Sequence, residues 1–379
     1  MPAPSSFAEA AEVMQAAAAE RQTVRIRGGG TKLSWGRPTE PPAIELSTER
    51  FDRLVEHNEG DLTAVLQAGM PLAGVQEALA EAGQMVALDP PLGEAGGATI
   101  GGVVATADSG PLRHRYGAAR DLILGITVVL SDGTIAKAGG KVIKNVAGYD
   151  LAKLFTGSFG TLGLIVEVVM RLHPRPRQTM TAVGHSDDPR ALGEAASAVA
   201  HSPFGPDGLD VWWVEGKGDV LARFGGAAPE AAAEEVAKLM EHAGLETRLI
   251  EDDDGLWERQ RAGQRSTDGT VVRVSGLAAE LARVVRSGEE VGTSVVGRAG
   301  LGLSWLTLAG GDSDAAVSGV EELRRRLQPF PCVVLDAPQA VREKVEVWGK
   351  AQAVSLTRRV KDRFDPHGVC NLGIFVGGI

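Results

Sequence analysis

Cysteine is scarce in this sequence, which has only Cys332 and Cys370 among its 379 residues. The two lie far apart, and neither has a further cysteine at the spacing of a metal site. The sequence therefore argues against a thiolate-bound zinc or iron–sulfur centre, and it excludes a framework of disulfides. A chain without disulfides fits a reducing compartment, so we expect a cytoplasmic protein.

Long hydrophobic runs are also missing. The longest, such as Leu162–Val169, are far shorter than the roughly 20 residues that cross a bilayer, and Glu167 interrupts that one. The first residues, Met1–Glu20, have neither a basic segment nor an apolar core, which predicts an alanine-rich amphipathic helix rather than a signal peptide. We therefore expect any membrane contact, for example peripheral attachment at the inner membrane, to come through partners.

Positive charge is in deficit. Lysine and arginine number 39 against 49 aspartates and glutamates, which gives a net charge of −10. Such an acidic surface repels nucleic acid and anionic lipid, so neither is an expected partner. Glycine, by contrast, is abundant at 49 residues, and no repeat or low-complexity period accounts for it. The glycines gather at a few places in the first half of the chain.

A proline-rich stretch, His173–Pro176, follows a predicted strand over Leu162–Leu172 and marks the clearest domain boundary. Beyond it, strands alternate with amphipathic helices over residues 178–335, which predicts an α+β domain with an antiparallel sheet. A last helix is predicted over Val341–Arg363. The triplet Asp252–Asp254 lacks the ligand pattern of a calcium loop, and we interpret it as a solvated turn.

Three glycine clusters lie within the first 165 residues, at Gly28–Gly30, Gly96–Gly102 and Gly157–Gly163. A strand that enters three glycines exposes successive backbone N–H groups and has no Cβ to block a ligand, which suits a diphosphate. The chain has no Gly-Lys-Ser/Thr of a P-loop, and Leu33 stands where a dinucleotide fingerprint needs glycine. Tight turns would explain one such cluster; three together favour backbone that lines a long ligand.

The segments RGGGTK, ATIGG, YG and NVAGYDLAKLFTGSFGTLG, with DPHGVCNLG near the end, resemble FAD-binding domains of the PCMH type, the vanillyl-alcohol oxidase superfamily. The resemblance covers about Val24–Pro174 and the C-terminal motif. Its most specific stretch, Gly140–Leu151, is similar to the E subunit, the smaller FAD-binding subunit, of bacterial glycolate oxidase.

The resemblance implies an α+β fold with a PCMH-type FAD-binding domain over residues 1–175, made of two subdomains at about 1–66 and 67–175. A smaller α+β cap with an antiparallel sheet would occupy residues 176–338, and residues 339–379 would return to the FAD domain. The flavin would be non-covalent, because Arg27–Trp35 contains no histidine and both cysteines lie beyond residue 330.

The same resemblance assigns cofactor contacts. The FAD diphosphate would be held by the first glycine loop, namely Arg27, Gly28, Gly29, Gly30, Thr31 and Lys32. The ribityl chain and flavin would be lined by Asp89, Pro90, Thr99, Gly101 and Gly102. The adenosine half would lie against Gly160, Gly163 and Ile165, with Asn371 returning from the tail.

Catalytic residues are harder to find. Relatives that oxidise 2-hydroxy acids share a metal-binding motif, G-H-x-G-D-G-N-x-H, which this chain lacks; the cap histidines His185, His201 and His242 are isolated, and we expect no metal. By the same resemblance, Ala107 stands where relatives often have an asparagine in the flavin loop. Arg113 and Tyr149 are the remaining catalytic candidates. We interpret Arg113 either as part of a clamp for a carboxylate or as part of a surface loop or subunit contact. Tyr149 would hydrogen-bond either a flavin-bound substrate or a structural partner.

These features predict an FAD-binding subunit of a glycolate oxidase-type complex in glyoxylate metabolism, with a role in assembly or electron transfer. Its expected partners are a larger FAD-containing subunit, which carries the missing histidine motif, and an iron–sulfur subunit. The alternatives are a stand-alone FAD-dependent alcohol or 2-hydroxy-acid dehydrogenase and a structural subunit without flavin.

Overall fold

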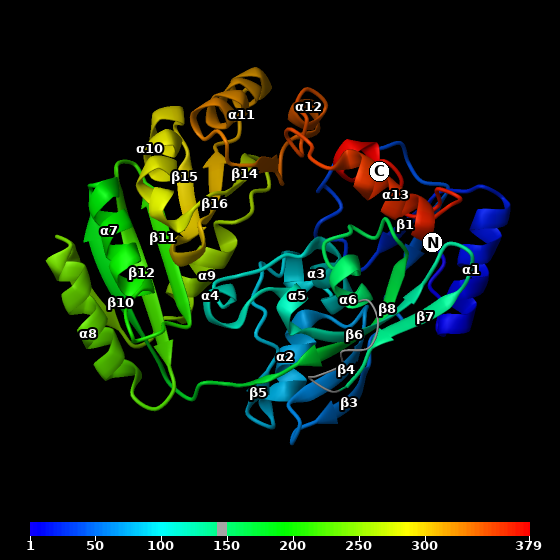
Figure 1. Ribbon diagram of the computed structural model, residues 1–379, viewed down its shortest axis with the longest axis horizontal. Helices are drawn as coiled ribbons and strands as arrows, with labels where there is room; N and C mark the ends of the chain where they lie inside the picture. Colours follow the sequence, from blue (N-terminus) through cyan, green and yellow to red (C-terminus); the bar gives the residue numbers. More distant parts are fainter. Residues whose placement is uncertain (142–149) are drawn as a thin grey trace. The chain divides into compact units, whose positions relative to one another are not determined.

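The computed structural model describes residues 1–141 and 150–379 (Figure 1). The described chain divides into two compact units. The first holds residues 1–109, 117–175 and 351–379, and the second holds residues 110–116 and 176–350. Both units combine helices with sheets, so the expected α+β class is confirmed.

The centre of the first unit is a five-stranded antiparallel sheet in the order β3-β4-β8-β6-β7. Its strands are β3 (Leu54–Asn58), β4 (Thr63–Gln67), β6 (Ile123–Val129), β7 (Ile135–Gly139) and β8 (Leu164–Arg171). Strand β4 is buried at every position, as expected of an inner strand covered on both faces, whereas the edge strand β7 alternates between exposed and half-buried positions. The predicted subdomain boundary at about residues 66–67 falls at the end of β4.

A second, parallel pair of strands in the first unit joins β1 (Val24–Arg27) to β2 (Ile44–Ser47). Helix α1 (Phe7–Ala19) packs on this pair, and Met14 and Leu46 are fully buried in their shared core. The C-terminal tail forms an isolated parallel bridge with β1, because the Val24 amide donates to the Val369 carbonyl at 2.8 Å (Figure 1).

The remaining elements of the first unit are short segments around these sheets. They are α2 (Leu72–Ala80), β5 (Gln84–Met85), η1 (Glu94–Gly96), α3 (Ile100–Thr106), α5 (Ala119–Leu122), α6 (Leu151–Phe155), β9 (His173–Pro174), α13 (Val354–Phe364) and η4 (Val376–Gly378). No helix in the part of the chain that the structure describes is long and apolar enough to cross a membrane.

The second unit, the cap, contains an eight-stranded antiparallel sheet in the order β13-β10-β12-β11-β15-β16-β14-β17. Its strands are β10 (Thr179–Ser186), β11 (Gly208–Val214), β12 (Lys217–Gly225), β13 (Glu246–Ile250), β14 (Thr270–Ser275), β15 (Ser294–Arg298), β16 (Leu303–Leu308) and β17 (Cys332–Val334). Its helices are α4 (Arg113–Tyr116), α7 (Pro189–Ala200), α8 (Pro229–His242), α9 (Asp254–Ala262), η2 (Ala278–Glu280), α10 (Leu281–Val291), η3 (Ala299–Leu301), α11 (Ser313–Arg326) and α12 (Gln339–Arg342).

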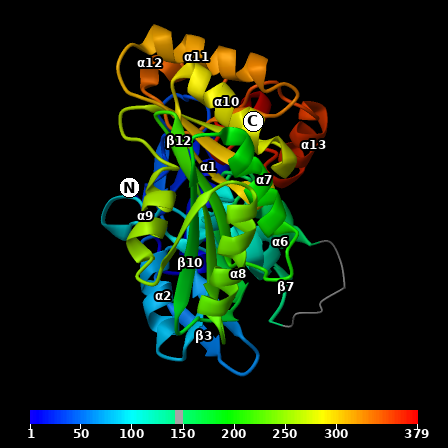
Figure 2. The ribbon, with the colours of Figure 1, turned by 90° about the vertical axis from the view of Figure 1, so that its left-hand side faces the viewer.

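The cap sheet is covered on both faces. Helices α7 and α8 pack across β10 and β12 (Figure 2), and the main core on this face contains Val220. The next residue, Leu221, belongs instead to a small cluster with Val183 and Trp257 of α9. Because neighbouring residues of a strand point to opposite faces, α9 covers the face away from α7 and α8.

The predicted final helix over Val341–Arg363 is wrong, because the structure has two short helices there, α12 and α13. Between them Val345 and Val347 are buried in the cap core, together with Val341 of α12. The segment up to residue 350 therefore belongs to the cap, and the chain returns to the first unit at residue 351 rather than at residue 339.

Both cysteine thiols are inaccessible. Cys332 and Cys370 are buried and unpaired. Burial raises the pKa of the Cys332 thiol to about 11, and burial also raises the pKa of Cys370. We expect the native protein to react with no thiol reagent at pH 8 and to react at two sites in denaturant, measured by thiol titration. Rapid labelling of the native protein would contradict this burial.

Candidate cofactor-binding site

A groove in the first unit brings the three glycine clusters together. It has a cavity of about 110 Å³. The predicted residues that line it are Gly28, Gly29, Gly30, Thr31, Lys32, Thr99, Gly101, Gly102, Gly160, Gly163, Ile165 and Asn371. Arg27, Asp89 and Pro90 are not among the lining residues.

The first glycine loop packs closely against the second. A Cβ built on Gly28 would lie 2.4 Å from Thr99 Oγ1, and one on Gly29 would lie 1.5 Å from the Gly97 carbonyl oxygen. Gly30 has a φ of +75°, a left-handed conformation that favours glycine. Within the described residues, the amides of Gly28–Gly30 donate no hydrogen bond to the rest of the chain. These N–H groups are therefore available to an anion in the groove.

The amides at the start of α3 are already used. The Thr99 hydroxyl accepts from the Gly102 amide at 3.2 Å, and the Gly101 amide donates to the Ala68 carbonyl at 2.8 Å. A Cβ on Gly101 would lie 2.6 Å from that of Ala68. The second cluster therefore forms a closely packed wall of the groove rather than an additional source of donors.

Side-chain hydrogen bonds of Asn371 connect the third glycine cluster to β1. The Asn371 side-chain amide donates to the Phe159 carbonyl at 2.6 Å, and its side-chain oxygen accepts from the Ile26 amide at 2.9 Å. A Cβ on Gly160 would lie 2.8 Å from the same Asn371 nitrogen. Asn371 thus holds the third glycine cluster beside β1, and these two hydrogen bonds fix the position of that wall of the groove.

A buried ion pair positions the tail that carries Asn371. The Lys361 ammonium pairs with Asp365 and also donates to the carbonyls of Thr161 at 2.7 Å and Cys370 at 2.8 Å. The Asp365 carboxylate accepts from the Val369 and Cys370 amides at 3.0 and 2.8 Å. Burial would raise the pKa of Asp365, but Lys361 and the backbone donors together lower it below the usual value.

The charges predicted to hold the cofactor are neutralised within the chain. Arg27 pairs with Glu45 at 3.8 Å outside the groove lining, and Lys32 pairs with Asp108 at 3.1 Å with both side chains almost fully buried. Sequence reasoning missed Arg25, which does line the groove. Arg25 and Arg27 both alternate with apolar residues on β1, and only the contacts of their side chains distinguish them.

Arg113, one of the two catalytic candidates, is not among the residues that line this groove. Arg113 belongs to α4 in the cap unit, and Tyr149 lies outside the described residues. The neighbours of Arg113 make contacts within the cap, where Arg115 pairs with Asp207 at 3.2 Å. Burial lowers the pKa of His114, and burial with the Asp207 charge raises that of Tyr116. Arg115 and Tyr116 therefore both interact with Asp207 within the cap.

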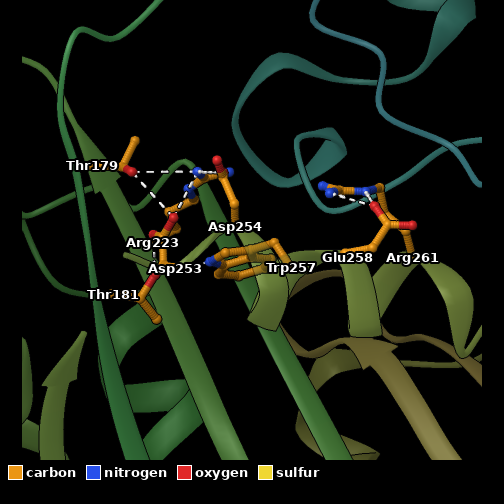
Figure 3. A network of polar contacts seen from close by, with 8 residues as sticks. All are labelled: Thr179, Thr181, Arg223, Asp253, Asp254, Trp257, Glu258 and Arg261. Carbon is orange, nitrogen blue, oxygen red and sulfur yellow. Dashed lines mark hydrogen bonds and ion pairs between the residues drawn. The ribbon is translucent and has the colours of Figure 1, made fainter. Parts of the chain in front are cut away.

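A polar network lies on the α9 face of the cap sheet (Figure 3). Asp253 is only 2% exposed, and its carboxylate accepts from Arg223 at 2.8 Å and from the Thr181 hydroxyl at 2.7 Å. The indole N–H of Trp257 donates to the same hydroxyl at 2.9 Å. The interpretation of Asp252–Asp254 as a solvated turn is therefore wrong for its middle residue, whose charge is compensated inside the cap.

Ala107 ends α3 in a left-handed conformation, with φ +52° and ψ +35°. Because a Cβ is disfavoured there, we expect Ala107→Gly to stabilise the first unit by roughly 0.5–1 kcal/mol. Ala105→Gly, inside the same helix, should instead destabilise it by about 1 kcal/mol. Urea unfolding of both variants measures the difference, and a lower midpoint for Ala107→Gly than for the parent would contradict the assigned strain.

Comparison with known proteins identifies a cofactor-binding domain in the first part of the chain. Residues 2–139 match the sequence family described as FAD binding domain. Residues 2–139 of this chain form an FAD binding domain. The predicted cofactor and the resemblance to PCMH-type FAD-binding proteins are thereby confirmed.

The curated relatives align with about half of the chain. Glycolate oxidase subunit GlcE of Escherichia coli (strain K12) is 35% identical over 186 residues, 49% of this chain and 52% of that protein. Glycolate oxidase subunit GlcD of Bacillus subtilis (strain 168) is 32% identical over 55% of this chain and 44% of its own length. D-lactate dehydrogenase of Archaeoglobus fulgidus is 37% identical over 46% of this chain and 38% of its own. The aligned region thus spans about half of these relatives or less.

Solved structures show the fold over nearly the whole chain. An alkyldihydroxyacetonephosphate synthase matches with a TM-score of 0.72 at 16% identity, covering 97% of this chain and 74% of that one. A chitooligosaccharide oxidase matches with a TM-score of 0.68 at 15% identity, covering 96% and 88%. At this identity the likeness concerns the fold alone.

The residues of the groove fit FAD. The loop Gly28–Gly30 offers donors without partners in the described chain, and a Cβ on Gly28 or Gly29 would collide with the opposite wall. No aspartate or glutamate lines the groove, so a diphosphate would meet no like charge there. An acidic protein can therefore hold an anionic cofactor through local amides rather than through its overall field.

Proposed function

We propose that this chain is the FAD-binding subunit of a complex of the glycolate oxidase type, which oxidises 2-hydroxy acids. The observation that carries the proposal is the 35% identity to glycolate oxidase subunit GlcE over 186 residues, about half of this chain. Its role would be assembly of the complex or transfer of electrons within it.

The contacts of the cap histidines support the proposal that the hydroxy acid binds in another subunit. His185 bonds Asp219 at 2.8 Å, whereas His201 and His242 each contact a backbone carbonyl of their own helix. In the described chain no group of three or more His, Cys, Asp or Glu side chains could hold a metal ion. We therefore propose that a larger FAD-containing subunit binds the hydroxy acid and that an iron–sulfur subunit takes up electrons.

The chain's own residues would bind and orient the flavin without a covalent link. When bound, FAD supplies a two-electron acceptor that can return electrons one at a time. The amides of Gly28–Gly30 would hold its diphosphate, and Asn371 would keep the third glycine cluster in place beside it. We propose a cytoplasmic location, or a peripheral one at the inner membrane through the partner subunits.

A stand-alone dehydrogenase is the second candidate, and one observation favours it. The D-lactate dehydrogenase of Archaeoglobus fulgidus is 37% identical over nearly half of this chain. Such an enzyme would need its own substrate-binding groups, with Arg113 and Tyr149 as the candidates. Its turnover would not depend on added subunits.

The test is to purify the chain alone and then, from the native host, together with the proteins that bind to it. The isolated chain should be yellow, with FAD released by denaturation, and should not reduce a dye with glycolate or D-lactate. The purified complex should contain a second flavoprotein and an iron–sulfur protein by mass spectrometry and should turn over. Steady turnover by the isolated chain would select the stand-alone enzyme. A colourless chain that added FAD cannot restore would select a structural subunit.

A further inference from the structure

The guanidinium of Arg25 has no carboxylate partner among the residues that the structure describes. Arg25 lies on β1, and one of its nitrogens donates to the Thr39 hydroxyl at 2.8 Å. Within the described part of the chain, Arg25 has no ion pair and no other hydrogen bond from its side chain. A guanidinium carries five N–H donors, so most of its hydrogen-bonding capacity remains unused.

The charges of the residues that line the groove indicate that Arg25 could bind an anion. Arg25 and Lys32 are the charged residues among those that line it. The Lys32 charge is compensated by Asp108 at 3.1 Å, and both side chains are at most 6% exposed. Arg25 therefore supplies positive charge that no carboxylate of the described chain neutralises, in a groove without acidic lining residues.

The position of Arg25 indicates which part of a long ligand would reach it. A second cavity, of about 390 Å³, adjoins the groove and shares Arg25, Asn371 and Ile374 with it. Arg25 thus stands where the two spaces meet, on the side of the groove where Asn371 fastens the third glycine cluster. A long anionic ligand that extends past Asn371 would pass this guanidinium.

We propose that Arg25 binds the ADP half of FAD through its diphosphate, and that Thr39 positions the guanidinium for this contact. A planar fork of N–H donors matches two phosphate oxygens, which a lysine cannot reproduce. The inference rests on the FAD binding domain and not on which substrate the complex oxidises.

The experiment measures binding of FAD, ADP and riboflavin to the apoprotein by calorimetry and flavin fluorescence, for the parent and for Arg25→Gln, Arg25→Lys and Thr39→Val. Arg25→Gln should weaken FAD and ADP at least tenfold and leave riboflavin within twofold. Arg25→Lys and Thr39→Val should each weaken ADP about threefold. The loss of FAD affinity on raising the salt concentration should be smaller in Arg25→Gln than in the parent.

Arg50→Gln, which removes an exposed arginine of the same unit, is the matched control and should bind all three ligands like the parent. ADP binding by Arg25→Gln within twofold of the parent would overturn the proposal. So would an equal loss for riboflavin and ADP, because that pattern would report a distorted groove. A parent apoprotein that binds no FAD would instead count against the cofactor assignment itself. All of these outcomes are independent of turnover with glycolate.

Discussion

Gly29→Val is expected to abolish FAD binding while leaving the cap folded. A Cβ at this position would lie 1.5 Å from the Gly97 carbonyl oxygen, which is backbone and cannot rotate away. The loop Gly28–Gly30 would have to move away from the second glycine cluster. Its free N–H groups would then no longer point together into the groove. We expect FAD affinity to fall more than 100-fold, about 3 kcal/mol, measured by the absorbance of bound flavin after dialysis.

Gly74→Ala is the matched control for this substitution. Gly74 lies in α2 of the same unit, and nothing stands within 4 Å of a Cβ built there. Alanine should therefore stabilise the helix by roughly 0.5–1 kcal/mol and leave the flavin in place. Circular dichroism should show that Gly29→Val keeps its cap sheet. Full flavin occupancy in Gly29→Val would show that the diphosphate lies elsewhere.

Local sequence signals predicted several elements of the first unit. The helix predicted within Met1–Glu20 is present as α1, and the strand predicted over Leu162–Leu172 is present as β8. Glycine runs also indicated which loops line the groove, because a ligand or a second loop can approach closely where no Cβ stands. The runs are visible in the sequence itself, whereas the contact of Gly29 with Gly97 forms only in the folded chain.

Features that depend on distant partners were not predictable in the same way. We predicted Arg27 as a groove residue, but Arg25 lines the groove instead. Arg27 pairs with Glu45 and Arg25 bonds Thr39, and both partners approach β1 only in the folded chain. The buried Asp253 looked solvated because Arg223 and Thr181 lie on other strands. The final helix was misjudged because Val345 and Val347 fill the cap core, which an isolated helical pattern does not reveal.

Asp365→Asn is expected to loosen the C-terminal tail and with it the groove. The substitution leaves the Lys361 ammonium buried without its charge partner, and breaking a buried pair in this way costs roughly 3–5 kcal/mol. The amides of Val369 and Cys370 also lose a carboxylate acceptor, so Asn371 is no longer held against Phe159. Urea unfolding at pH 7 should show the loss of stability, and FAD titration should show weaker binding. Asp362→Asn, an exposed position of the same helix, should change stability by less than about 0.5 kcal/mol.

The pH dependence of this pair provides the second measurement. Because the folded pKa of Asp365 is lowered, the unfolded chain binds its proton more readily, and stability from this group rises with pH. The contribution is complete above the unfolded pKa of about 4 and is lost as the pH falls through the folded value. The difference in unfolding free energy between the parent and Asp365→Asn should therefore be constant from pH 7 to pH 5 and shrink below pH 4. A difference that stays constant down to pH 3 would mean that the carboxylate charge of Asp365 does not hold the tail.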